Sequence, residues 1–299
     1  MTSLQKQIVQ LNPFDDEEAL VLGVKRIATN GRNKVFEVSG SGHKPRILKI
    51  DVENSRSRPH KLQIEQWAAL KARAAGVLAP AYLKTGITSC GTAYSLTERL
   101  SGHSLTSSQI RTQIIRDLGL QLQMLSKIKL AGFGWLNPVS WQGTYSHWNS
   151  FLTDFFLEAH QKLSAMGAFT SGELEGIQQV VETKSPSLHV EKSSLVHRDL
   201  RPANILAESN RIVAILDWEN AIAGDPLMDI AIFSLAWGCS KHTRHLLEAQ
   251  GHTWNLQLQE KIGLYRIICG VAELAFRVKT GMRSQTLRSL ILKDIQSIG

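Results

Sequence analysis

Three oxygen-bearing side chains in the second half of the sequence have the types and spacing of a metal and phosphate site. Asp199 is followed five residues later by Asn204 and thirteen residues after that by Asp217, each between short apolar runs. Buried carboxylates need cations or hydrogen-bond donors, and Asp and Asn oxygens are ligands that Mg²⁺ prefers, completed by phosphate oxygens and water. The polar centre of the stretch 204–217 predicts a hairpin that brings Asn204 and Asp217 together to share one metal ion.

The wider motif, HRDLRPANIL at 197–206 followed by ILDW at 215–218, resembles the catalytic loop and metal-binding segment of the protein-kinase-like fold. GDPLMDIA at 224–231 is similar to the GDPxxDLA motif of aminoglycoside phosphotransferases and related small-molecule kinases. A protein kinase would place an activation segment and an APE motif there, and the sequence contains neither. The chain is thereby identified as a member of the aminoglycoside phosphotransferase family, and GFGW at 132–135 resembles hygromycin B phosphotransferases in particular.

The resemblance implies a role for each residue of the main motif. Asp199 would be the catalytic base, or the carboxylate that orients the attacking hydroxyl, and Arg201 would be the counter-charge to the transferred γ-phosphoryl group. Asn204 and Asp217 would be the Mg²⁺ ligands. Phosphoryl transfer needs little beyond positioning and charge neutralisation, which agrees with so small a set of residues.

Two neighbours of Asp199 have separate expectations. His197 is expected to hold the backbone of the loop rather than to transfer protons. Arg198 stands where the family more often has a small residue, and we expect its side chain to pair with Asp225 or Asp229.

In the first part of the chain, Lys49 lies in the middle of the apolar strand RILKI at 46–50, where a lysine is otherwise a poor choice. It resembles the kinase lysine that binds the α- and β-phosphates. The best-placed carboxylate on the following helix is Glu65, which is expected to pair with it, although a surface carboxylate is the simpler alternative for Glu65.

Two further segments would complete a nucleotide site. The turn around Gly31 stands where the phosphate-covering loop belongs, although one glycine is a weak signal. A segment after the fifth predicted strand resembles a kinase hinge, whose backbone groups would meet adenine, and it comprises Thr97, Glu98 and Arg99. The sequence contains no GxxxxGK[ST] loop, which disfavours P-loop chemistry.

Periodicity predicts a β-rich nucleotide-binding lobe over residues 1–100 and a larger, mainly helical catalytic and substrate-binding lobe over 101–299. The fold class is therefore α+β, and the resemblance implies the bilobal protein-kinase-like fold. Strands are expected at 20–28, 33–38, 46–50, 82–88 and 92–97. Helices are expected at 59–76, 105–130, 148–166, 171–183, 226–237, 256–280 and 284–298. Residues 194–218 predict a small sheet, and 132–145 and 238–255 are expected to be loops.

Composition narrows the class of protein. Apolar residues at 43% and charged residues at 20% are typical of a globular protein and exclude an extended disordered chain. No apolar run is long enough to span a membrane and the first residues lack a signal-peptide pattern, so a cytoplasmic protein is expected. Cys90, Cys239 and Cys269 are an odd number at wide spacing, which favours buried thiols over disulfides or a zinc site.

The formal net charge of +8 favours anionic partners in general. Eight Lys and Arg residues fall between Lys44 and Arg73, but Trp67 is the one aromatic residue there, so nucleic-acid binding is a minor alternative. The sequence leaves the oligomeric state open.

Together these features predict an enzyme that uses Mg²⁺ and ATP, with GTP as an alternative, to phosphorylate a hydroxyl of a small molecule. An aminoglycoside or related sugar-containing antibiotic is the first expectation, and a choline, homoserine or sugar kinase is the alternative. A polycationic acceptor needs an acidic pocket, yet residues 219–299 hold seven carboxylates against nine Lys and Arg. Such a pocket could still gather Glu219, Asp225, Asp229, Glu248 and Glu273. An atypical protein kinase and a pseudokinase that only binds ligands are less favoured.

Overall fold

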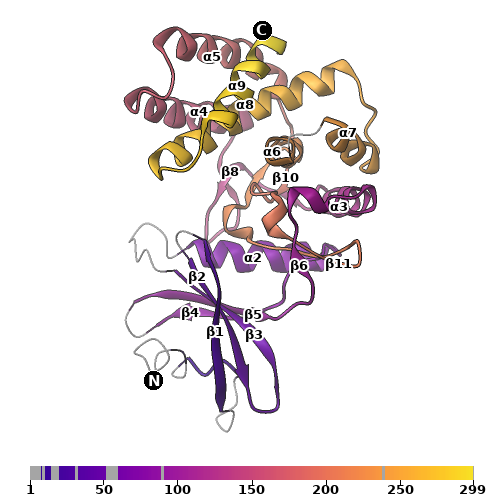
Figure 1. Cartoon of the computed structure of the whole chain (residues 1–299). Coiled ribbons are helices and arrows are strands. Elements are labelled where there is room, and N and C mark those ends of the chain that lie inside the picture. Colours follow the sequence, from indigo (N-terminus) through magenta and orange to yellow (C-terminus); the bar gives the residue numbers. More distant parts are fainter. Residues whose placement is uncertain are drawn as a thin grey trace.

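The computed structural model describes residue 8 and residues 11–14, 20–30, 33–51, 60–88, 91–237 and 240–298. The N-terminal lobe is built on one antiparallel sheet with the strand order β1-β2-β3-β5-β4 (Figure 1). Helix α2 (Lys61–Ala74) lies between this sheet and the helical part of the molecule. The strands are β1 (Val21–Asn30), β2 (Asn33–Gly40), β3 (His43–Asp51), β4 (Tyr82–Ile87) and β5 (Ala93–Glu98).

Alternation along β3 decides which side chain faces α2. Leu48 and Ile50 are 1% and 6% exposed and belong to the small core of this lobe, together with Phe36 and Leu96. Successive side chains of a strand point to opposite faces, so Lys49 points away from that core. It reaches α2 instead, as its contact with Glu65 shows.

The C-terminal lobe is mainly helical, with α8 at its centre in contact with α4, α6 and α9 (Figure 1). Its helices are α3 (Thr112–Leu125), α4 (Trp148–Ala165), α5 (Ser171–Lys184), α6 (Leu227–Trp237), α7 (Ser240–Ala249), α8 (Leu256–Lys279) and α9 (Gln285–Ile298). Together with the N-terminal sheet, this arrangement confirms the predicted α+β, bilobal kinase-like fold.

Two small sheets lie inside the C-terminal lobe, near its junction with the N-terminal lobe. One has the order β7-β10-β13-β8-β9, and the other has the order β12-β11-β6. The first contains β7 (Lys129–Leu130), β8 (Phe133–Leu136), β9 (Gly143–Tyr145), β10 (Ser193–Val196) and β13 (Ile222–Gly224). The second contains β6 (His103–Ser104), β11 (Ile205–Glu208) and β12 (Arg211–Ile215).

Several predicted elements need correction. The segment 132–145 is not a loop, because it contains β8 and β9, which are too short for a periodic pattern. The segment 194–218 contributes to two sheets instead of one, and the helix expected at 105–130 is confined to α3.

The segment 238–255 also differs from the predicted loop, since it contains α7. This helix is mostly polar, and Leu246 and Leu247 are its fully buried apolar side chains. It packs against α3 at Gly119, where an added Cβ would lie 2.4 Å from the Cβ of Ala249. The segment resembles a loop because it is short and polar, and packing on α3 stabilises it as a helix.

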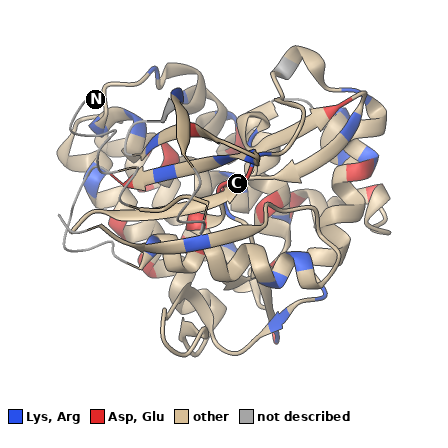
Figure 2. Ribbon diagram, turned by 90° about the horizontal axis from the view of Figure 1, so that it is seen from below, with Lys and Arg blue, Asp and Glu red and all other residues tan. Residues whose placement is uncertain are grey.

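The structure shows how the charged residues are distributed, whether a helix could span a membrane, and where Cys269 lies. Lys and Arg residues are interspersed with Asp and Glu residues along the ribbon of both lobes (Figure 2). None of the helices in the described ranges is both long enough and apolar enough to cross a bilayer. Cys269 is a buried free thiol, as predicted, and Cys90 and Cys239 lie outside the described residues.

Candidate active site

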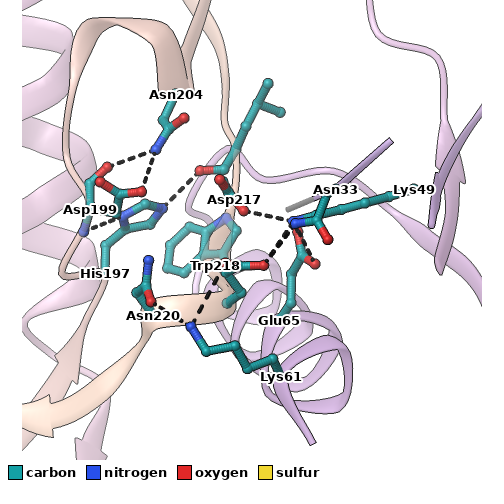
Figure 3. A network of polar contacts seen from close by, with 12 residues as sticks. Asn33, Lys49, Lys61, Glu65, His197, Asp199, Asn204, Asp217, Trp218 and Asn220 are labelled. Atoms are coloured by element: carbon teal, nitrogen blue, oxygen red, sulfur yellow. Dashed lines mark hydrogen bonds and ion pairs between the residues drawn. The ribbon is translucent and has the colours of Figure 1, made fainter. Parts of the chain in front are cut away.

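The loop that follows β10 carries the sequence motif and is held by buried hydrogen bonds. His197 is fully buried, its Nε2 donates to the carbonyl oxygen of Leu216 at 2.9 Å, and its Nδ1 accepts from the backbone N–H of Asp199 at 3.2 Å (Figure 3). Burial lowers the pKa of His197, and the neutral ring with its proton on Nε2 satisfies both contacts. The prediction that His197 holds the loop backbone is confirmed.

Asp229, from the GDPLMDIA motif, clamps the same loop. Its two carboxylate oxygens accept from the backbone N–H groups of His197 and Arg198, each at 2.8 Å. Arg198 has φ 60°, in the left-handed region, where a residue other than glycine carries backbone strain. The two bonds to Asp229 hold this conformation and thereby set the direction in which Asp199 points.

Asp199 is 7% exposed and contacts two donors. Arg201 donates from Nε to Oδ1, and Asn204 donates from Nδ2 to Oδ2 at 3.0 Å. Burial raises the pKa of Asp199 to about 6, while the charge of Arg201 opposes that rise. A carboxylate with such a pKa can accept a proton near neutral pH.

A hairpin returns the chain from Asn204 to Asp217, as predicted. β11 pairs with β12, and the backbone N–H of Leu216 donates to the carbonyl oxygen of Asn204 at 2.7 Å. Both contacts of Asn204 Nδ2 go to Asp199, so the amide oxygen of Asn204 is turned away from it (Figure 3). Asp217 has φ 66° and points toward the N-terminal lobe, where its Oδ1 accepts from Lys49 at 2.7 Å.

Lys49 joins the two lobes. Its Nζ lies 3.2 and 3.1 Å from the two carboxylate oxygens of Glu65 on α2, so the structure brings together the pair expected from the sequence. Glu65 is 3% exposed, and burial raises its pKa to about 7 against the lowering by Lys49. Burial would lower the pKa of Lys49, but the surrounding carboxylates outweigh it and hold that pKa well above its usual value.

Glu219 was named above only as one residue that an acidic acceptor pocket could gather, and the structure places it beside Lys49. Its Oε2 lies 3.2 Å from Lys49 Nζ and accepts from Asn33 Nδ2 at 3.1 Å. Lys61 Nζ lies 3.8 Å from its other oxygen. Burial works against ionisation, but Lys49 and Lys61 lower the pKa of Glu219 to about 2. The short turn Trp218–Asn220 brings Glu219 to the same lysine as Asp217. The two carboxylates are separated by one residue in the sequence, and this spacing was the signal that could have indicated a shared partner.

The expected hinge lies at the end of β5. Thr97 pairs with Ile47 of β3, and the backbone N–H of Glu98 donates to the carbonyl oxygen of Ala81 at 3.2 Å. The backbone N–H of Glu98 is therefore engaged within the N-terminal lobe. Arg99 pairs through Nε with Glu37 at 2.8 Å. Gly31 lies outside the described residues.

The side chains of Arg198 and Asp225 do not form the predicted ion pair. Arg198 Nε donates to the carbonyl oxygen of Asn220 at 3.1 Å, and Asp229 accepts from its backbone only. Asp225 accepts from the hydroxyl of Tyr265 at 2.7 Å. Arg198 turns away from both carboxylates because its guanidinium packs on two aromatic rings.

Comparisons with solved structures identify the same fold in other proteins. A thermostable mutant of aminoglycoside phosphotransferase APH(4)-Ia, in ternary complex with AMP-PNP and hygromycin B, has a TM-score of 0.77 at 17% identity, over 97% of this chain and 98% of that chain. A protein from Haemophilus somnus 129PT assigned as a fructosamine-3-kinase has a TM-score of 0.72 at 19% identity, over 98% and 97% of the chains. The GDP complex of aminoglycoside 2'-phosphotransferase-IIIa has a TM-score of 0.72 at 16% identity, over 99% of each chain.

Sequence comparison adds one relative and one family. The uncharacterised protein YcbJ of Bacillus subtilis strain 168 is 40% identical over 75 residues. This match covers 23% of this chain and only 24% of the length of YcbJ. The phosphotransferase enzyme family matches residues 23–265. That range includes Lys49 and Glu65 in one lobe and the loop from Asp199 to Asp217 in the other, so the chain belongs to the phosphotransferase enzyme family, as its motifs predicted.

Proposed function

We propose that this phosphotransferase moves the γ-phosphoryl group of ATP to a hydroxyl of a small molecule, with Mg²⁺ as cofactor. The observation that carries the proposal is the convergence of both lobes: Lys49 of β3 contacts Asp217 at 2.7 Å, and the loop holding Asp217 also holds Asp199 through Asn204. A phosphoryl-transfer site needs a cation for the phosphates, metal ligands and a hydroxyl-orienting carboxylate in one place, and these residues supply the three.

The residues present fit a magnesium ion. Asn204 uses its Nδ2 for Asp199 and leaves Oδ1 as a ligand atom. Oδ1 of Asp217 accepts from Lys49, which leaves its second carboxylate oxygen as a ligand atom for the ion. When bound, the ion would neutralise charge on the phosphates. Glu219 lies beside the same lysine and adds negative charge there.

On the nucleotide side, Lys49 would bind the α- and β-phosphates, and Glu65 would hold it in place. On the acceptor side, Asp199 would accept the proton of the attacking hydroxyl as the oxygen bonds to the γ-phosphorus and the bond to the β-phosphate breaks. Arg201, 42% exposed and bonded to Asp199, would stabilise charge on the transferred group.

Sugar-like molecules are the first acceptor class. The solved relatives are described with hygromycin B or as a fructosamine-3-kinase, which supports an aminoglycoside or related sugar-containing antibiotic as one candidate and a sugar-type acceptor as the second. GTP is an alternative donor, since one structural neighbour is a GDP complex. We expect residues 1–100 to bind the nucleotide, residues 101–299 to bind the acceptor, and the protein to act in the cytoplasm.

The test is an ADP-release screen of hydroxylated antibiotics, sugars and amino alcohols with Mg·ATP. At least one acceptor should stimulate ADP release and gain a phosphate that mass spectrometry detects. Asp199→Asn should lower that rate by several orders of magnitude while Mg·ATP binding persists. Equal, slow ADP release by the wild type and Asp199→Asn with every acceptor would instead favour a pseudokinase.

A further inference from the structure

Arg198 lies beside the reacting carboxylate with two uncommitted nitrogens. Its guanidinium carbon is 4.5 Å from the ring centre of Trp135 and 5.3 Å from that of Phe155, and Nε donates to the carbonyl oxygen of Asn220. Within the described part of the chain, Nη1 and Nη2 make no hydrogen bond and no ion pair. Burial lowers the pKa of Arg198, and the neighbouring charges of Asp199 and Asp229 oppose that shift only in part, since neither carboxylate bonds the guanidinium directly.

The carboxylates on this side of the loop are already engaged. Asp199 and Glu273 are both bonded by arginine side chains, and Asp229 is bonded by two backbone N–H groups. Asp225 accepts from Tyr265 and from the backbone. The residues that could have formed an acidic acceptor pocket are therefore hydrogen-bonded within the protein, whereas Nη1 and Nη2 of Arg198 have no hydrogen-bond partner among the described residues.

From this arrangement we infer that Arg198 binds an anionic group of the acceptor, a carboxylate or a phosphate carried near the hydroxyl that Asp199 orients. This inference rests on the proposed function. A guanidinium presents its N–H groups in a planar fork that matches carboxylate and phosphate oxygens, and stacking on Trp135 and Phe155 holds the fork in one orientation. Arg201 is already paired with Asp199, so Arg198 is the guanidinium whose terminal nitrogens remain for a ligand.

The exposed part of the aromatic surface extends the site. Trp135 is 39% exposed and borders Arg198, so the carbon skeleton of a sugar-like acceptor can rest on it while its anionic group meets the guanidinium. A polycationic aminoglycoside would bring like charge to the Arg198 guanidinium instead. The inferred acceptor class is a polyhydroxylated acid or a phosphorylated polyol.

Four six-carbon probes of one skeleton test the charge dependence: gluconate (carboxylate), glucitol phosphate (phosphate), glucitol (neutral) and glucamine (cationic). Each is titrated by calorimetry, at constant ionic strength, into protein loaded with Mg²⁺ and AMP-PNP. Gluconate, glucitol phosphate or both should bind at least about tenfold more tightly than glucitol, and glucamine should bind most weakly. The two anionic probes distinguish a carboxylate from a phosphate.

Variants assign the effect to Arg198. Arg198→Gln should abolish the advantage of the anionic probes, and Arg198→Met, which keeps the aliphatic stem on the rings, should do the same if the glutamine variant fails to fold. Arg244→Gln is the matched control, because Arg244 is exposed on α7 and pairs with Glu248, and it should bind the probes as the wild type does.

The inference is overturned if glucamine binds as tightly as the anions, if neither anion binds at roughly 10 mM, or if their advantage survives in both Arg198 variants. ADP release is measured separately on the same samples. Anion binding without phosphoryl transfer to any acceptor would count against the proposed function and would leave only the binding of an anion by Arg198 standing.

Discussion

Replacing Arg201 with methionine should move the acidic limb of the pH–rate profile upward. Asp199 must be deprotonated to accept the hydroxyl proton, so activity is lost as the pH falls through its pKa, which burial raises to about 6. Arg201 opposes this rise through its contact with Asp199. Without Arg201, the burial and the negative charge of Asp217, which both raise the pKa of Asp199, act with less opposition.

The size of the shift follows from the contact. A hydrogen bond to a charged group contributes about 1.5–3 kcal/mol, and one pKa unit corresponds to about 1.4 kcal/mol. The side chain of Arg201 is 42% exposed, so solvent screens the pair and the lower end of that range applies. The acidic limb should therefore move by about one unit, from about 6 to about 7.

The assay is acceptor-dependent ADP release, measured as kcat/KM from about pH 5 to about pH 9 at saturating Mg·ATP. Arg211→Met is the control, because Arg211 is 73% exposed and lies 3.9 Å from Asp117, and its limb should stay near that of the wild type. Two results would refute the assignment of this titration to Asp199. One is an acidic limb in Arg201→Met at the same pH as in the wild type, and the other is a wild-type acidic limb in the residual activity of Asp199→Asn.

Three further substitutions test other parts of the structure. Asp217→Asn should raise the Mg²⁺ requirement about tenfold or more, because it removes a charged ligand; an unchanged requirement in an Mg²⁺ titration would contradict the metal assignment. The rings of Trp141, in the β8-β9 segment, and Trp67, on α2, are stacked with centroids 5.1 Å apart and an interplanar angle of 5°. Trp141→Ala removes this stack and should lower the free energy of unfolding, measured by urea denaturation, by about 1 kcal/mol or more. Phe151→Ala should lower it by about 3–5 kcal/mol, because Phe151 is fully buried among aromatic rings; a loss below about 1 kcal/mol would argue against this core.

Much of the candidate site could be predicted because its contacts are local in the chain. Asp199 and Asn204 are bonded five residues apart, and the hairpin to Asp217 depends on pairing between adjacent strands. Lys49 was recognisable because strand alternation makes a lone lysine among apolar residues conspicuous. Helix α7 was missed because it is short and mostly polar, and its stability comes from packing on α3.

The spacing of the motif residues, the two-lobe division and the family therefore follow from the amino-acid sequence, because they depend on periodicity and on contacts between near neighbours in the chain. Only the tertiary structure decided the partners of the other charges. Glu219 meets Lys49 across 170 residues, and Arg198 stacks on Trp135 and Phe155 instead of pairing with Asp225. A charged side chain is compensated by whatever the packed lobes bring within reach, and the sequence alone does not show which distant residue that will be.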